Sequence, residues 1–166
     1  MLLIRPAQAG DETAVAGVHV SSWQVGYRGL LPDAYLDALK PEDRARRYTF
    51  GGPDPLKPAT LVALVDGVIR GFATTLITAG SCQGELAALY VDPEHWGCGI
   101  GTLLLTEARV RLAARGYSST VLWMLAGNTR AQHFYERHGW QADGVTRSQE
   151  IWGIAVQESR YTRRLP

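Results

Sequence analysis

The stretch from residue 85 to residue 102 reads ELAALYVDPEHWGCGIGT, a strand-like segment followed directly by a glycine-rich turn and the start of a helix. Residues 85–91 are mostly apolar, and Asp92-Pro93 stops the predicted strand. From Ile100 onward an apolar residue recurs every four positions, until Gly116 ends the predicted helix. The pattern therefore predicts a strand whose carboxyl end leads into the amino end of an amphipathic helix.

Three glycines, Gly97, Gly99 and Gly101, stand where this helix begins. Because they have no side chains, they let another group approach the backbone closely. The first N–H groups of a helix have no partners within it, and the helix dipole favours an anion at this end. A phosphate or pyrophosphate is the expected ligand, although a glycine-rich turn without a ligand fits the spacing equally well. The segment is not a P-loop, because no Lys-Ser/Thr pair follows the last glycine.

Outward from this unit, the sequence predicts both strands and helices before it and after it. The expected strands cover residues 2–4, 60–65, 68–77, 85–91 and 119–125, with a strand-like tail at 150–162. The expected helices begin near residues 12, 33, 41, 100 and 128, with Asp11 as the cap of the first, and residues 51–58 form a loop. This order indicates a mixed sheet with helices on its faces.

The composition is that of an ordinary folded domain. The chain has 166 residues, of which 46% are hydrophobic and 20% charged, and this length fits one domain covering residues 1–166. Seventeen Lys and Arg residues against sixteen Asp and Glu residues leave a net charge of +1. This balance argues against a protein that binds nucleic acid or a membrane surface in general, because such proteins usually carry a clear basic excess.

Several features indicate a cytoplasmic protein without a bound metal. The apolar run at the N-terminus is three residues long, far shorter than the core of a signal peptide, and no stretch approaches the ~20 apolar residues of a membrane span. The two cysteines, Cys82 and Cys98, are too few for a disulfide framework and lack the spacing of metal ligands.

Two motifs make the sequence resemble the GNAT superfamily of N-acetyltransferases. Residues 96–101 are similar to the family's motif A, which reads Gln/Arg-x-x-Gly-x-Gly/Ala between a strand and a helix, but Trp96 stands where Gln or Arg is usual. Residues 128–140, NTRAQHFYERHGW, are similar to motif B, in which Asn, Ala, Phe-Tyr-Glu and a Gly-aromatic pair recur. The resemblance spans residues 60–141 in order and register.

This resemblance implies both a fold and a reaction. The fold is a single α/β (α+β) domain with a mixed, mostly antiparallel sheet of six to seven strands flanked by helices. The reaction is the transfer of an acetyl group from acetyl-coenzyme A to a primary amine of a small molecule or peptide, by direct attack in a ternary complex. The alternative is a non-catalytic sensor or partner module of the same fold that binds acyl-coenzyme A.

The resemblance also implies a donor site. The main-chain amides of motif A hold the pyrophosphate of the donor in this family, and here they belong to Gly97, Cys98, Gly99, Ile100, Gly101 and Thr102. The pantetheine arm lies like an added strand along Leu89, Tyr90 and Val91, and the Val91 N–H is expected to bond the thioester carbonyl and the oxyanion formed from it. Asn128, Ala131 and Tyr135 of motif B complete the site. Asn128 is expected to hold the pantetheine or a water, with a plain helix N-cap as its alternative.

Glu85 is the candidate general base. A base is needed because an ordinary amine is protonated at neutral pH and cannot attack. Glu85 lies eleven residues before Trp96, as does the catalytic glutamate of family members that acetylate histones. Strict alternation places it on an apolar strand face with Ala87, Leu89 and Val91, although a β-bulge, common in the family, would change that face. A solvent-facing glutamate at the start of the strand is the alternative.

Tyr135 matches the family tyrosine that protonates the departing thiolate, with simple helix packing as its alternative. On the acceptor side, Trp23 and Tyr27 are four residues apart and can face one direction. They are predicted to line the amine site together with Glu85, or else to pack their helix onto the sheet. The sequence does not identify the amine, and its strand-like tail is compatible with a homodimer.

Overall fold

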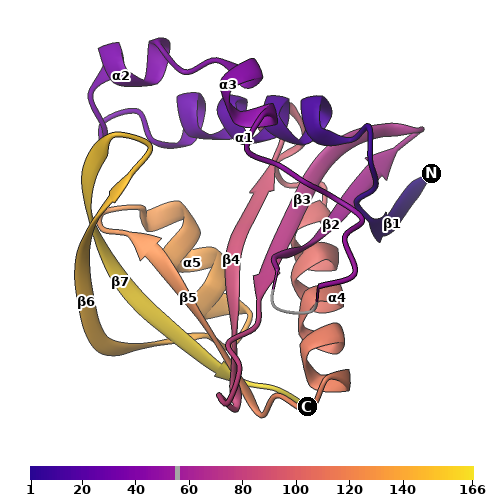
Figure 1. Ribbon diagram of the computed structural model, residues 1–166. Coiled ribbons are helices and arrows are strands. Elements are labelled where there is room, and N and C mark those ends of the chain that lie inside the picture. The colour runs from indigo at the N-terminus through magenta and orange to yellow at the C-terminus, as the bar shows by residue number, and fades with distance from the viewer. Residues whose placement is uncertain (55–56) are drawn as a thin grey trace.

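Seven strands form one mixed sheet in the computed structural model, which describes residues 1–54 and 57–166 (Figure 1). The strands are β1 (Leu2–Pro6), β2 (Ala59–Val65), β3 (Val68–Leu76), β4 (Gln83–Val91), β5 (Ser119–Leu125), β6 (Gln141–Ile151) and β7 (Ile154–Arg164). Their order across the sheet is β1-β2-β3-β4-β5-β7-β6, and only β4 and β5 are parallel neighbours. The predicted mixed, mostly antiparallel sheet is confirmed.

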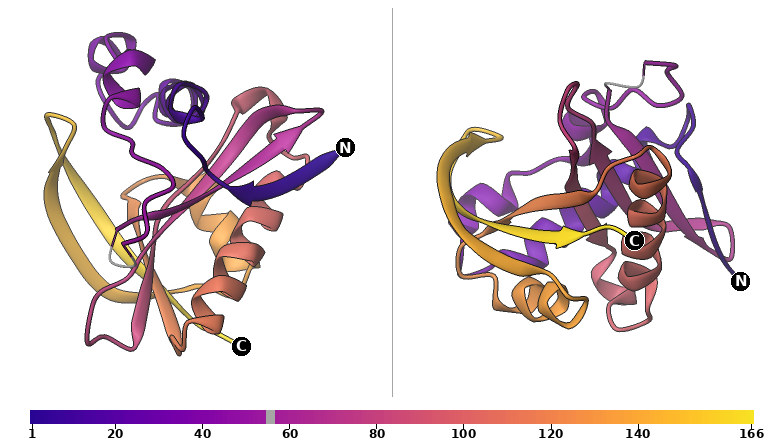
Figure 2. Two further views of the ribbon diagram at one scale, coloured as in Figure 1. Left: turned by 45° about the vertical axis from the view of Figure 1, so that its right-hand side comes forward. Right: turned by 90° about the horizontal axis from the view of Figure 1, so that it is seen from below.

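Helices cover both faces of the sheet. They are α1 (Glu12–Gly26), α2 (Asp33–Asp37), α3 (Pro41–Ala45), the short 3-10 helix η1 (Pro93–His95), α4 (Ile100–Ala114) and α5 (Thr129–Arg137). Leu104 of α4 and Tyr135 of α5 pack into the core on one face, whereas Val15 and Val18 of α1 pack against the other. The left view of Figure 2 shows α1 apart from α4 and α5, with the strands between them.

Helix α4 lies directly on the strands because two glycines leave room for it. A Cβ on Gly84 of β4 would lie 2.8 Å from Leu112 Cδ2, and a Cβ on Gly71 of β3 would lie 3.0 Å from Ile100 Cγ2. This close packing holds the amino end of α4 at the carboxyl end of β4.

Strands β4 and β5 diverge along their length. They pair only where residues 83–85 meet residues 119–121. In Figure 1 the two strands lie together near the bottom and separate toward the top, where α1 crosses. Beyond the short paired segment, the edge of β4 that faces β5 therefore has no strand partner among the described residues.

A β-bulge changes the two faces of β4. The register of β4 against β3 shifts by one residue at Ala87. Leu86, Leu89 and Val91 all pack on the α4 side of the sheet. Glu85 precedes Leu86 directly, so it lies on the opposite face. The prediction that Glu85 shares a face with Leu89 and Val91 is therefore wrong, because strict alternation fails across the bulge.

The tail forms two strands where the sequence analysis predicts a single strand-like segment. Strands β6 and β7 pair with each other and turn at Trp152-Gly153, whose φ angles are 52° and 81°. Two positive φ angles are typical of the tight turns that match the twist of paired strands. Tryptophan is an unusual residue for such a position, and β6 is largely polar and exposed. The sequence of the turn and the polar character of β6 therefore did not indicate a hairpin.

Two local predictions also have definite outcomes. Asp11 stands at the cap position of α1, but its carboxylate accepts hydrogen bonds from Arg5 Nη1 at 2.7 Å and from the main-chain N–H of Gln8. It forms no side-chain cap bond, and it joins β1 to the start of α1 instead. In the predicted loop at 51–58, residues 55 and 56 lie outside the described residues.

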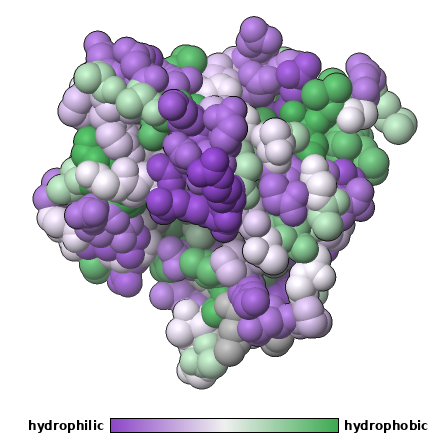
Figure 3. Space-filling view, turned by 45° about the horizontal axis from the view of Figure 1, so that its top comes forward, coloured by the Kyte–Doolittle hydropathy of each residue, from purple (hydrophilic) through white to green (hydrophobic). Residues whose placement is uncertain are grey.

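The surface seen with the top of the molecule turned forward is mixed. Hydrophilic side chains gather near its centre, and separate hydrophobic areas lie around them (Figure 3). Within residues 1–54 and 57–166, no helix combines the length and the apolar character needed to cross a membrane.

Candidate active site

A cavity of about 750 Å³ lies where β4 and β5 diverge. Its walls come from both strands, from α1, α4 and α5, and from the β6–β7 hairpin. Every residue predicted for the site lines this cavity except Cys98, whose thiol is exposed. The predicted residues in its lining are Trp23, Tyr27, Glu85, Leu89, Tyr90, Val91, Gly97, Gly99, Ile100, Gly101, Thr102, Asn128, Ala131 and Tyr135.

Main-chain groups of β4 face the divergence between the strands. Asp92 directly follows β4, and its main-chain N–H donates to the carbonyl of Arg70 on β3 at 2.8 Å. Hydrogen-bonding directions alternate along an antiparallel pair, so the N–H and C=O groups of Leu89 and Val91 turn away from β3. The main-chain N–H and C=O groups of Tyr90 turn toward β3 instead. Tyr90 nevertheless belongs to the lining of the cavity. An extended ligand laid along β4 can therefore bond to Leu89 and Val91 as an added strand.

The loop between η1 and α4 adopts a conformation that needs glycine. Gly97 and Gly99 have φ angles of +79° and +82°, and a Cβ on either residue would meet nothing within 4 Å. Gly101 differs, because a Cβ there would lie 3.4 Å from Phe134 Cζ. The loop presents bare main chain at the amino end of a fifteen-residue helix, an arrangement suited to an anion.

Thr102 joins α4 to the residue that follows α5. Its Oγ1 lies 3.1 Å from His138 Nε2, and His138 Nδ1 lies 2.7 Å from the Phe134 carbonyl. Since a carbonyl can only accept, Nδ1 donates to it, and in a neutral imidazole Nε2 then accepts from the Thr102 hydroxyl. This contact, which the sequence analysis did not assign, fixes the two helices on either side of the predicted donor site.

Trp96 connects three elements beside the glycine loop. Its indole N–H donates to the Val91 carbonyl at 2.8 Å. The guanidinium of Arg130, at the start of α5, lies 3.4 Å from the centre of its ring. A Cβ on Gly26, the last residue of α1, would lie 3.7 Å from Trp96 Cη2. Trp96 thus holds the ends of β4, α1 and α5 together in the place where the family usually has a polar side chain.

Helix α5 carries a cap and a buried hydroxyl. Asn128 Oδ1 accepts a hydrogen bond from the Ala131 N–H at 3.2 Å, which is the N-cap alternative for this residue. Tyr135 is buried, with its ring edge-on to Trp140 at 5.8 Å. Burial raises the pKa of Tyr135, so its hydroxyl keeps its proton at neutral pH. A protonated hydroxyl in the cavity can act as an acid.

Glu85 lies at the point where the two strands separate. Burial raises the pKa of the Glu85 carboxyl, the charge of Glu158 adds to this rise, and the charge of Arg147 opposes it. A carboxylate with a raised pKa accepts a proton more readily than an ordinary surface carboxylate does. The raised pKa and the position in the cavity are compatible with the expected role of Glu85 as a general base.

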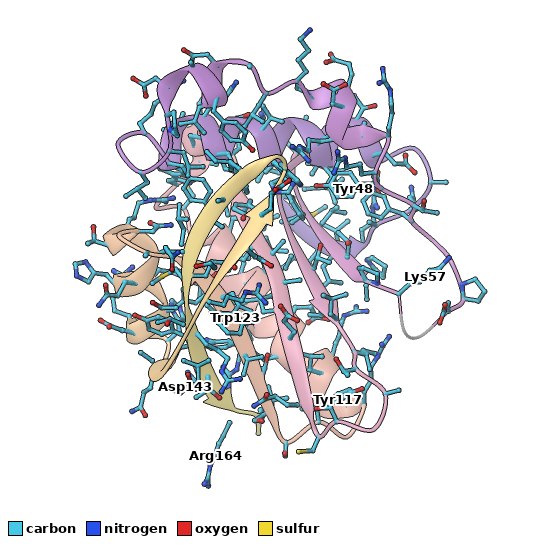
Figure 4. All side chains as sticks on the ribbon, turned by 60° about the vertical axis from the view of Figure 1, so that its left-hand side comes forward. Tyr48, Lys57, Tyr117, Trp123, Asp143 and Arg164 are labelled. Atoms are coloured by element: carbon cyan, nitrogen blue, oxygen red, sulfur yellow. The ribbon has the colours of Figure 1, made fainter. Side chains whose placement is uncertain are left out.

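Glu158 of β7 is a site residue that the sequence analysis missed. It is only 7% exposed, and its Oε1 accepts hydrogen bonds from Arg147 Nε at 2.9 Å and from Gln149 Nε2 at 2.6 Å. The Arg147 guanidinium also lies 4.0 Å from the ring of Trp123 on β5, the residue labelled near the centre of Figure 4. A signal was present, because Glu158 alternates with the apolar Val156 on one face of the tail.

Aromatic side chains line the same part of the cavity. Trp23 of α1 stacks on Trp152 of the β6–β7 turn with ring centres 4.2 Å apart, and His19 lies edge-on to Trp152. The hydroxyls of Tyr27 and Tyr90 lie 3.3 Å apart. Burial lowers the pKa of His19 well below its ordinary value and raises the pKa of both tyrosines, so these side chains are neutral at pH 7. Trp23 and Tyr27 thus both pack α1 and line the cavity.

The cavity therefore has two parts with different chemistry. We call the part beside the glycine loop, the edge of β4 and α5 the donor half, because it offers main-chain groups and a helix amino end. We call the part lined by Glu85, Glu158 and the aromatic side chains the acceptor half. Among the residues that the structure describes, no group of three or more His, Cys, Asp or Glu side chains is arranged to hold a metal ion.

Comparison with known sequences finds acetyltransferases. The model of the acetyltransferase (GNAT) family matches residues 20–140. An uncharacterized N-acetyltransferase of Bacillus subtilis strain 168, YuaI, is 28% identical over 131 residues, which cover 77% of this chain and 74% of that protein. The phosphinothricin N-acetyltransferase of Streptomyces viridochromogenes is 28% identical over 157 residues, covering 87% of this chain and 77% of that protein.

Comparison with solved structures finds the same fold. The PaiA N-acetyltransferase of Thermoplasma acidophilum, in complex with coenzyme A, matches with a TM-score of 0.79 at 21% identity over 99% of both chains. The yncA protein of Salmonella typhimurium, solved with acetyl-coenzyme A, matches with a TM-score of 0.72 at 18% identity, over 100% of this chain and 95% of that one. These likenesses confirm the predicted fold.

Proposed function

Because the chain belongs to the acetyltransferase (GNAT) family, we propose that it transfers the acetyl group of acetyl-coenzyme A to a primary amine of a small molecule or peptide. The amine attacks the thioester directly while both substrates are bound. The observation that carries this proposal is the single cavity that extends from the glycine loop to Glu85 and Tyr135. It offers a place for an anionic donor and, next to it, a base and an acid.

The donor half has the groups that acetyl-coenzyme A requires. The amides at residues 97–102 hold the pyrophosphate at the amino end of α4, where the helix dipole favours negative charge. Leu89 and Val91 offer their outward main-chain groups to the pantetheine arm, and Asn128 and Ala131 complete its site. The thioester oxygen can only accept a hydrogen bond, so the Val91 N–H is its donor, while the Val91 carbonyl accepts from Trp96. That N–H stabilises the oxyanion as it forms.

The proton transfers fall to two side chains. Glu85 takes a proton from the ammonium form of the acceptor, directly or through water, which frees the lone pair for attack. A C–N bond then forms, the C–S bond breaks, and the new amide nitrogen loses a second proton, which replaces the proton that Tyr135 gives up. Tyr135 gives its hydroxyl proton to the sulfur, since its raised pKa keeps that proton available at neutral pH. The base therefore acts on the nitrogen of the acceptor, and the acid acts on the sulfur of the donor.

The experiment that tests the proposal is acetyl transfer to a panel of primary amines, measured by mass spectrometry of the products. Product mass avoids thiol-reactive dyes, which Cys82 and Cys98 would confuse because both thiols are exposed. We expect at least one amine to gain an acetyl group at a rate that depends on protein concentration. Saturable donor binding without transfer to any amine would favour the alternative, a non-catalytic module that binds acyl-coenzyme A.

Two further expectations belong to this proposal. A cytoplasmic setting is supported by the two exposed free thiols. A homodimer is supported by the position of β6 at the edge of the sheet, where a second copy can pair with it. Light scattering during size-exclusion chromatography tests the dimer, and a monomer at micromolar concentration would contradict it.

A further inference from the structure

We propose that Glu158 binds the ammonium group of the acceptor, and that the acceptor is a cationic primary amine on an aromatic or compact apolar skeleton with no carboxylate of its own. This inference rests on the proposed function. It goes beyond that function by naming a substrate class and a specificity-determining residue in the acceptor half of the cavity.

The first argument is the way in which Glu158 is held. Within residues 1–54 and 57–166, the two hydrogen bonds that Glu158 accepts, from Arg147 and Gln149, both end on Oε1. The residue is nearly fully buried and lines the cavity, so its Oε2 is left to a ligand. A carboxylate fixed by two donors does not need to reorganise when a cation binds. Its attraction for that cation is also stronger than it would be in water, because the surroundings are less polar.

The second argument is the charge of the acceptor half. Glu85 and Glu158 are two acids, and Arg147 is one base already paired with Glu158 at 2.9 Å. His19 adds no charge, because burial lowers its pKa well below the ordinary value. The other guanidiniums that line the cavity within the described residues, those of Arg130 and Arg137, come from α5 on the donor side. The guanidinium of Arg44 stacks on Trp152 at 2.9 Å but does not line the cavity. Among the described residues, the charged side chains that face the acceptor half are therefore two acids and one paired base, which favours an ammonium and disfavours a carboxylate on the same molecule.

The third argument is the chemistry of the remaining wall. Trp23, Tyr27, Tyr90 and Trp152 present aromatic surface around the two acids. Such a wall excludes water from an apolar skeleton. The Ser22 hydroxyl and the Gln149 amide also line the cavity, but they already donate hydrogen bonds to the His19 carbonyl and to Glu158. An arylalkylamine fits this combination of acid and aromatic surface.

A matched pair of amines tests the proposal on the wild-type protein. 2-Phenylethylamine and L-phenylalanine share a primary amine and a phenyl ring, and differ by one carboxylate. We expect 2-phenylethylamine to bind the protein saturated with coenzyme A, in a calorimetric titration, at least about tenfold more tightly than L-phenylalanine. Absence of 2-phenylethylamine binding, or equal or tighter binding of L-phenylalanine, overturns the proposal without any variant.

The role of Glu158 is tested by Glu158→Gln, with Glu150→Gln as the control. Glu150 is an exposed acid on β6 that does not line the cavity, and it receives the same change. We expect Glu158→Gln to raise the KM or Kd for 2-phenylethylamine by about ten- to a hundredfold, with much less effect on kcat, because a charge-assisted hydrogen bond is lost. Unchanged affinity in folded Glu158→Gln, or an equal loss in Glu150→Gln, overturns the role.

The two proposals fail in distinguishable ways. If no amine is acetylated, the proposed function fails. The calorimetric titration still measures the affinity for 2-phenylethylamine, so it still tests whether Glu158 binds the ammonium group. If amines are acetylated while 2-phenylethylamine is neither bound nor used, the acetyl transfer stands and the substrate class is wrong. Thermal unfolding of each variant shows that the proteins compared are folded.

Discussion

At the scale of single residues, the Glu85 carboxyl has the role that is most sharply testable. A general base acts in its ionised form, so the rate falls as the pH drops through its pKa. Burial raises that pKa, and the fall is therefore expected above the ordinary range of a glutamate. We predict that Glu85→Gln lowers kcat by about 10²–10⁴-fold and removes this acidic limb from the pH–rate profile.

The control for this change is again Glu150→Gln, which alters an exposed acid of β6 outside the cavity. We expect its pH–rate profile to match that of the wild type. An unchanged acidic limb in Glu85→Gln would remove Glu85 from the role of base.

Tyr135 is predicted to serve the reaction rather than donor binding. Tyr135→Phe keeps the ring packed against Trp140 and Phe134 but removes the hydroxyl. We expect turnover to fall by about 10²-fold, while the Kd for acetyl-coenzyme A stays within about twofold. Rapid-quench rates and calorimetry measure the two quantities separately. Wild-type turnover in this variant would leave Tyr135 as a packing residue only.

The residues of the site were predictable to different degrees. Glu85 was found by its distance from Trp96 and by the family resemblance, whereas the count of alternating faces failed at the bulge at Ala87. Glu158 was missed because no motif contains it and its alternation with Val156 is a weak signal; its importance arises when β7 and β6 bring it into an ion pair with Arg147. Such a contact between distant segments depends on tertiary structure.

At the scale of elements, the glycine loop before α4 is expected to bind the donor through its conformation. Gly99 has a φ angle of +82°, which costs an alanine about 1–2 kcal/mol. We predict that Gly99→Ala raises the Kd for acetyl-coenzyme A by about tenfold or more, measured by calorimetry. The control is Gly17→Ala in α1, where a Cβ meets nothing within 4 Å and the helix gains stability. Equal donor affinity in both variants would contradict the account of the loop.

Trp96 is expected to hold this loop in place. Trp96→Ala removes both the hydrogen bond to Val91 and the stack under Arg130, and we predict that it lowers the free energy of unfolding by about 2 kcal/mol. It should also weaken acetyl-coenzyme A binding, since the loop is then less fixed. Trp96→Phe keeps a ring for Arg130 and should lose less of both. The account fails if denaturant unfolding and donor titration show Trp96→Ala to be identical to the wild type.

The elements themselves were predictable where their patterns are strong. The strand, glycine loop and helix of residues 85–114 follow from apolar periodicity and a proline stop, and the structure confirms them. The β6–β7 hairpin was not predicted because β6 is polar and exposed, and because its turn places Trp152 at a positive φ angle. A strand that is stabilised mainly by pairing with its partner strand shows little apolar alternation in its own sequence.

At the scale of the whole molecule, the function depends on one feature of the sheet. β4 and β5 are parallel, pair for three residues and then diverge, and the cavity opens between them. Local patterns predicted most of the strands, and the family resemblance implied a mixed, mostly antiparallel sheet. The order of the strands and the divergence of β4 from β5 were not predicted and are seen only in the structure. The donor half and the acceptor half meet in this opening, because α4 and α5 cover one face and α1 covers the other.

The most direct test of this account is a calorimetric titration of the purified protein with acetyl-coenzyme A, repeated with free coenzyme A. We predict one saturable site for both ligands, because the pyrophosphate and pantetheine contacts do not involve the acetyl group. In a sample shown to be folded, the absence of binding by either ligand would contradict the central claim that the opening between β4 and β5 is a donor site.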